Sequence, residues 1–222
     1  MPAPLFAWLA ACAFAAAGEP NLPPVGAAPC VACRAPASDP RSAFSPQEWE
    51  VLQEGGVWRA PAVPRSVSAA DPSSDSAAAS LVPRPPREVW AVLTDFERWP
   101  EFMPLLRETR VERREGAQLW VAQKFSVLFY PMRHTTVYQL DASDGRLAWR
   151  LDPDAPHDLA ASEGHWELIG VDGGSATLVR YEAKVRAGRA VPEFLERMLR
   201  ERALGQMLDG LRGEVLRRFP QS

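Results

Sequence analysis

The sequence predicts an α+β fold in which an antiparallel sheet of consecutive strands packs against one long C-terminal helix. Two observations carry this prediction. Six strand-like segments follow one another between residues 108 and 187, and the residues from Pro192 to Phe219 repeat their apolar side chains with helical spacing. The chain has 222 residues, of which 46% are hydrophobic. This is enough for one sizeable core, so we expect a single packed domain.

The chain begins with an apolar stretch over residues 1–17, which is shorter than the roughly 20 residues needed to span a bilayer. Alanines precede Gly18 as small residues do at a signal-peptidase site. We therefore expect a signal peptide over 1–17 and an exported protein, periplasmic or secreted. Two alternatives remain: Leu9 to Cys12 forms a lipobox and Cys12 carries a membrane anchor, or the N-terminus is uncleaved and frayed.

Residues 18–44 are rich in proline and alanine and have no hydrophobic periodicity, so we expect a disordered tether. Cys30 and Cys33 lie in this segment as a CxxC pair. Haem attachment needs a histidine directly after such a pair, zinc needs two further ligands, and a redox dithiol needs a helix start. We interpret the pair as a local disulfide or as idle thiols.

A short helix is expected over residues 45–56, because Ser45 and Glu48 flank a proline as the two ends of a capping box. Residues 57–67 are strand-like but contain prolines, which favour an edge position in a sheet. Residues 77–82 can return as the partner strand.

Two helical pieces and a meander follow. A proline pair precedes apolar residues at helical spacing over residues 85–96, and a second helical piece covers residues 96–103. Turns that contain glycine separate several of the later segments, which predicts antiparallel hairpins. The strand-like segments are 108–114, 118–129, 133–141, 146–151, 163–171 and 176–187.

Alternation along the strands predicts which face of the sheet is buried. In the last strand, Tyr181 and Ala183 alternate with charged Glu182 and Lys184. The sheet should therefore have one apolar face and one solvent-exposed face, and the C-terminal helix should cover the apolar face. The apolar stripe of that helix changes side near Gly205, where we expect a kink or break.

Residues 85–104 read PPREVWAVLTDFERWPEFMP. This segment resembles the signature of the START-like superfamily, also called SRPBCC or Bet v 1-like, and is nearest to its coenzyme Q-binding and polyketide cyclase branches. Residues 188–195 and 211–212 are similar to parts of the C-terminal helix of that superfamily. The resemblance implies a START-like domain over residues 57–222 with the helix-grip fold, in which the meander wraps around the helix.

The resemblance also implies an internal cavity that binds a lipid or another hydrophobic small molecule. Each candidate on the predicted inner surfaces could equally serve ordinary core packing, and Arg202 could orient a polar head group or a ligand carboxylate, or reach water at the cavity mouth. The candidate ligand-binding residues are Phe102, Phe125, Trp149, Trp166, Tyr181, Leu195, Met198, Leu199 and Arg202.

The same scaffold hosts polyketide cyclases and aromatases, so an enzyme is the alternative function. It would require at least two polar side chains converging in the cavity. His134 shares a strand face with Tyr138, and Glu163 shares one with His165; we interpret both pairs as surface cross-strand contacts. We therefore expect no catalytic residues, cofactor or metal. A third possibility is a filled domain that acts as an interaction module.

The formal net charge of −3 and the pI near 5.7 argue against a broad basic surface, and hence against nucleic acid as a partner. We expect a monomer whose partner is a hydrophobic ligand and which contacts a membrane only transiently.

Overall fold

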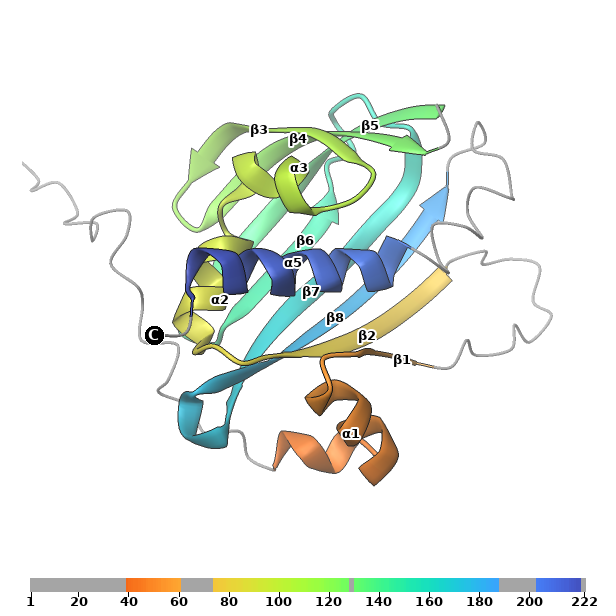
Figure 1. Ribbon diagram of the computed structural model, residues 1–222. Coiled ribbons are helices and arrows are strands. Elements are labelled where there is room, and N and C mark those ends of the chain that lie inside the picture. Colours follow the sequence, from red (N-terminus) through yellow and green to blue (C-terminus); the bar gives the residue numbers. More distant parts are fainter. Residues whose placement is uncertain (1–38, 61–73, 128–129, 188–202, 221–222) are drawn as a thin grey trace, which may run out of the picture.

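The computed structural model describes residues 39–60, 74–127, 130–187 and 203–220 (Figure 1). Within these residues eight strands form one sheet in the order β1-β2-β8-β7-β6-β5-β4-β3, and each neighbouring pair is antiparallel. A C-terminal helix lies across the sheet, which confirms the predicted α+β helix-grip fold. The strands are β1 (Val57–Arg59), β2 (Ser74–Val82), β3 (Leu106–Glu115), β4 (Gln118–Val127), β5 (Tyr130–Asp141), β6 (Arg146–Leu151), β7 (Leu159–Val171) and β8 (Ala176–Ala187).

The meander follows the sequence pattern closely. β6 and β8 have the expected bounds, whereas β5 and β7 begin earlier than expected, at Tyr130 and Leu159. Gly116 and Gly145 adopt φ values of 58° and 62° in the turns that follow β3 and β5. Glycine tolerates this left-handed conformation without steric cost, so these turns reverse the chain within a few residues.

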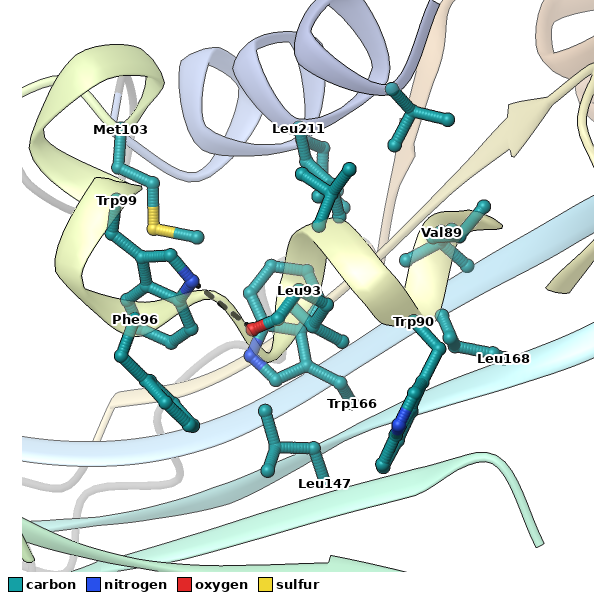
Figure 2. Close-up of a cluster of buried hydrophobic side chains, with 14 of the residues drawn as sticks. Val89, Trp90, Leu93, Phe96, Trp99, Met103, Leu147, Trp166, Leu168 and Leu211 are labelled. Atoms are coloured by element: carbon teal, nitrogen blue, oxygen red, sulfur yellow. Dashed lines mark hydrogen bonds between the residues drawn. The ribbon is translucent and has the colours of Figure 1, made fainter. Parts of the chain in front are cut away.

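Three short helical elements connect β2 to β3: α2 (Pro86–Leu93), η2 (Phe96–Arg98) and α3 (Trp99–Phe102). α2 begins at a proline. Proline is tolerated there because the backbone N–H groups of the first turn have no intrahelical acceptor, so its missing N–H costs no hydrogen bond. Its buried face includes Val89, Trp90 and Leu93. The indole Nε1 of Trp99 donates a hydrogen bond to the carbonyl oxygen of Leu93 at 3.1 Å and ties α3 to the end of α2 (Figure 2).

The C-terminal helix α5 (Leu204–Arg218) crosses the concave face of the sheet, with α2 beside its C-terminal end (Figure 1). Gly205 lies in the first described turn of α5, and residues 188–202, which would form the other side of the expected kink, lie outside the described residues. In the part of the chain that the structure describes, no helix combines the length and apolar character needed to cross a membrane.

The N-terminal elements η1 (Pro40–Ala43) and α1 (Pro46–Gln53) precede the sheet. α1 begins with the predicted capping box: the backbone N–H of Ser45 donates to Glu48 Oε2 at 2.8 Å, and the backbone N–H of Glu48 donates to Ser45 Oγ at 3.3 Å. Phe44 packs against the ring of Trp49. Packed structure therefore begins before residue 45, where the tether was expected to end.

These N-terminal elements cover part of the sheet face opposite α5. Leu52 of α1 is fully buried in a second apolar cluster with Ala79 of β2 and Leu178 of β8. The expectation that this face is wet throughout is therefore wrong at its β1–β2–β8 end. Strand alternation does not predict that this face is buried, because α1 covers it and the sequence analysis assigned this helix to the segment before the domain.

Candidate ligand-binding cavity

A cavity of about 250 Å³ lies between the N-terminal end of α5 and the concave face of the sheet. Its walls come from β2, from the segment joining α3 to β3, from β4 to β8, and from the first turns of α5. The described lining residues include no lysine, arginine, aspartate or glutamate. An unpaired charge against these residues would lose its hydration without compensation, so the described part of the wall favours an uncharged and mainly apolar group.

Three of the predicted residues form one aromatic wall. Trp149 of β6 and Tyr181 of β8 are stacked, with ring centroids 5.2 Å apart, and Trp166 of β7 meets Tyr181 edge-on at 4.7 Å. Burial raises the pKa of Tyr181, so its hydroxyl stays protonated. All three residues line the cavity, as the alternation of the strands predicts.

Gly164 makes room for this wall. It stands opposite Trp149 in the β6–β7 register. A Cβ atom at Gly164 would lie 2.5 Å from the Trp149 ring and 2.2 Å from the backbone oxygen of Glu182. The absent side chain therefore leaves the space that the Trp149 ring occupies at the cavity wall.

Phe125, another predicted residue, lines the cavity from β4. Its ring stacks on His134 of β5, with centroids 5.1 Å apart and planes 10° from parallel. His134 is only 8% exposed, and its Nδ1 is enclosed and has no hydrogen-bond partner among the described residues. Burial lowers the pKa of His134 to about 4, with Asp158 opposing the shift, so the imidazole is neutral at pH 7.

A small polar cluster lies beside His134. The Oε1 of Gln123 accepts hydrogen bonds from Thr136 Oγ1 at 3.0 Å and from the Tyr138 hydroxyl at 3.4 Å. All of these residues are buried and line the cavity. Burial raises the pKa of Tyr138, so this hydroxyl also stays protonated.

The structure corrects the interpretation of His134 and Tyr138 as a surface pair, because both face the interior. Leu140 lies two residues beyond Tyr138 on the same face and packs against the core. Side chains separated by an even number of residues in a strand point to the same face, so the position of Leu140 would have predicted that His134 and Tyr138 point inward. Glu163 and His165 lie on the opposite face of the sheet, as expected.

The remaining predicted residues differ in outcome. Phe102 does not line the cavity; its side chain is partly buried against the main core, and Trp99 and Met103 line the cavity from the same stretch of chain. On α5, Leu204 and Met207 line the cavity, although the sequence placed the helix contacts earlier. Four candidates lie outside the described residues: Leu195, Met198, Leu199 and Arg202.

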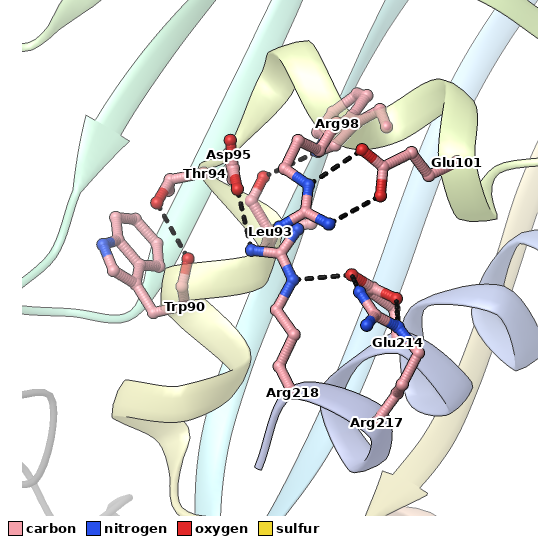
Figure 3. Close-up of polar contacts among 10 residues, drawn as sticks. Trp90, Leu93, Thr94, Asp95, Arg98, Glu101, Glu214, Arg217 and Arg218 are labelled. Carbon is pink, nitrogen blue, oxygen red and sulfur yellow. Dashed lines mark hydrogen bonds and ion pairs between the residues drawn. The ribbon is translucent and has the colours of Figure 1, made fainter.

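An ionic network fixes the other end of α5 to the α2–η2 junction (Figure 3). Glu214 is 6% exposed and accepts hydrogen bonds from Arg217, at 2.7 Å, and from Arg218 Nε, at 2.6 Å. Arg218 Nη1 also pairs with Asp95 Oδ2 at 2.7 Å. The bonds from Arg217 and then Arg218 lower the pKa of Glu214 to about 2, so the carboxylate is ionised at neutral pH.

Residues 82–212 match the family model described as polyketide cyclase/dehydrase and lipid transport. The match spans more than half of the chain. None of the curated proteins matches the sequence.

Several solved structures share the fold. The Zhui aromatase/cyclase from Streptomyces sp. R1128 has a TM-score of 0.58 and 20% identity, covering 66% of this chain and 95% of its own. A STAR-related lipid transfer protein from Xanthomonas axonopodis has a TM-score of 0.58 and 18% identity, covering 72% and 98%. A protein from Thermus thermophilus has a TM-score of 0.58 and 21% identity, covering 65% and 99%. At these identities the likeness establishes the fold alone.

Proposed function

The chain belongs to the polyketide cyclase/dehydrase and lipid transport family, and on this basis we propose that it binds a hydrophobic small molecule or lipid in the cavity beneath α5. The observation that carries the proposal is the cavity itself, which has aromatic walls and no charged lining among the described residues. A ligand that removes about 300 Å² of apolar surface from water gains about 7 kcal/mol before the cost of ordering.

The size of the cavity favours a compact ligand. Its volume of about 250 Å³ is just below the range of pockets that hold drug-sized molecules, about 300–1,000 Å³. The two most informative structural neighbours are named as an aromatase/cyclase and a lipid transfer protein. Both names are consistent with binding of a hydrophobic ligand.

Native mass spectrometry of the protein purified from its own cells, followed by organic extraction, tests the proposal. Ala183 of β8 is 5% exposed and lines the cavity, whereas Lys184 is exposed on the opposite face. We expect an apolar molecule to accompany the wild type and the Lys184→Leu control but not Ala183→Leu, whose larger side chain occupies the site. A quinone among the extracted molecules would assign the chain to the coenzyme Q-binding branch. A wild type that carries nothing and takes up no added apolar ligand would contradict the proposal.

One observation favours an enzyme of the cyclase type as a second candidate, because Gln123, Thr136 and Tyr138 converge at the cavity wall. The pKa of His134 argues for binding without catalysis. A general base works best with a pKa near the working pH, and the pKa of His134 is lowered to about 4. Turnover of a linear polyketone by the wild type, and its loss in Tyr138→Phe, would establish the enzyme.

We also propose that the protein is exported, with residues 1–17 as its leader, and that it acts as a monomer that meets membranes only to exchange ligand. The apolar start of the sequence supports the first point. The intact mass of the protein recovered from its own cells distinguishes a cleaved chain that starts at Gly18, a chain lipidated on Cys12 and an uncleaved chain. Size-exclusion chromatography with light scattering checks the monomer.

A further inference from the structure

The polar side chains of the cavity concentrate on two neighbouring strands, β4 and β5. Gln123 and His134 stand directly opposite each other in the register of these strands. Side chains in directly opposite positions of an antiparallel pair lie about 5 Å apart, close enough for both to contact one atom of a ligand. They are 4% and 8% exposed, so both are enclosed by protein.

The hydrogen bonds of Gln123 leave one end of its amide unused. Thr136 and Tyr138 both donate to Oε1, and within the described residues the amide nitrogen donates to no protein group. If the amide were turned over, the nitrogen would donate to those hydroxyls and the oxygen would be the unused end. In either orientation, one polar end of Gln123 has no partner among the described residues, and the side chain lines the cavity.

His134 offers a second unmatched atom. Its Nδ1 is buried and without a partner in the described part of the chain, and the ring is held by stacking on Phe125. A neutral imidazole carries one N–H donor and one acceptor nitrogen. The ring lines the cavity, and a buried polar atom that bonds neither to water nor to protein is costly. A ligand oxygen that turns the ring towards itself and supplies the missing bond is therefore bound more tightly than a ligand without such an oxygen.

The surroundings specify what kind of group supplies that bond. No lysine or arginine is among the described lining residues, so a carboxylate placed against Gln123 and His134 would lose its hydration without gaining a counter-charge from this described part of the wall. A hydroxyl or carbonyl oxygen can bond to Gln123 and His134 without this loss. The flat faces of Trp149 and Tyr181, stacked at 5.2 Å, favour planar rings in the rest of the ligand.

We propose that Gln123 and His134 together recognise a single neutral hydroxyl or carbonyl oxygen, so that the occupant of the cavity is a planar ring-containing alcohol, phenol or ketone. The inference rests on the proposed binding function. It further predicts that a hydrocarbon or a free carboxylate of the same shape binds more weakly than the neutral alcohol, phenol or ketone.

Equilibrium dialysis with naphthalene, 2-naphthol and 2-naphthoate tests this inference, because the three probes share one ring system. We expect the wild type to bind 2-naphthol most tightly. His134→Phe keeps an aromatic ring that stacks on Phe125, and Gln123→Leu keeps the side-chain volume. Each variant should lower the ratio of 2-naphthol affinity to naphthalene affinity by about tenfold, as expected for one lost hydrogen bond, while naphthalene affinity is retained.

The matched controls are His165→Phe and Gln139→Leu, which make the same changes on the opposite face of the sheet. Both should leave the affinity ratio at the wild-type value, and thermal unfolding checks that each variant is folded. Naphthalene binding without a preference for 2-naphthol, or an unchanged ratio in both cavity variants, overturns the inference and leaves the proposed function intact. Failure of the wild type to bind any of the three probes overturns the proposed function itself.

Discussion

The two ends of α5 meet the same sheet in different ways. Towards the C-terminus, Leu208, Leu211 and Val215 are fully buried in a solid apolar core (Figure 2). Towards the N-terminus, Leu204 and Met207 face the cavity. The difference arises because α2 lies beside only the C-terminal end of α5 and fills the space there with its own side chains. One end of the molecule supplies stability, and the other end can therefore remain open.

Truncating a side chain at the solid end should have the largest effect. Leu211→Ala leaves a void among fully buried neighbours and should lower the free energy of unfolding by about 3 kcal/mol. Met207→Ala borders a space that is already empty and should cost about 1 kcal/mol. Urea denaturation measures both values. Equal costs at the two positions would show that the ends of α5 do not differ.

The ionic network belongs to the solid end and should also contribute strongly. Glu214→Ala removes the closest carboxylate of the largely buried Arg218 guanidinium, which keeps its pair with Asp95, and the loss of this charged hydrogen bond should cost about 2 kcal/mol. Asp209→Ala removes an exposed carboxylate from the same helix and should change the stability by less than about 0.5 kcal/mol. The free energy of unfolding from denaturant titrations compares the two variants. A small loss in Glu214→Ala would show that α5 is held by apolar packing alone.

The same network predicts a dependence of stability on pH. The pKa of Glu214 falls from an ordinary value of 4.5 in the unfolded chain to about 2 in the folded protein. Its stabilising contribution is therefore complete above about pH 4.5 and is lost as the pH falls towards 2. The difference in unfolding free energy between the wild type and Glu214→Gln should shrink over this range. A difference that stays constant from pH 5 to pH 2 would contradict the assignment.

Alanine substitutions at two glycines of α5 should change the stability by smaller amounts and in opposite directions. A Cβ at Gly210 would lie 2.0 Å from the backbone oxygen of Phe102, so Gly210→Ala should push α3 and α5 apart and cost about 1–3 kcal/mol. Gly213 has no atom near that position, and Gly213→Ala should stabilise the helix by about 0.5–1 kcal/mol. Thermal unfolding of both variants checks the signs. Stabilisation by Gly210→Ala would show that this close approach is absent.

The sequence predicts the strands and the aromatic wall well, because alternation with a period of two fixes the face of each side chain once one apolar residue is placed. Trp149, Trp166 and Tyr181 follow from this rule. β5 is more difficult, because both of its faces carry polar residues and hydrophobicity alone does not separate them. The prediction for His134 and Tyr138 is therefore wrong about the face.

Other features depend on contacts between distant segments, which local patterns do not contain. Trp99 rather than Phe102 lines the cavity, because the short helix α3 sets which of its aromatic side chains points towards the sheet. The burial of Leu178 beneath α1 likewise depends on how the chain before β1 folds back. Neither arrangement leaves a periodic signal in the sequence.

Crystallography under xenon pressure tests the central claim most directly, because an apolar cavity that remains dry takes up xenon. We predict xenon density between the Trp149–Tyr181 wall and the first turns of α5, and none between α2 and the C-terminal half of α5. Side chains that fill the space beside Trp149 and admit no xenon would contradict the claim that this end of the fold is open.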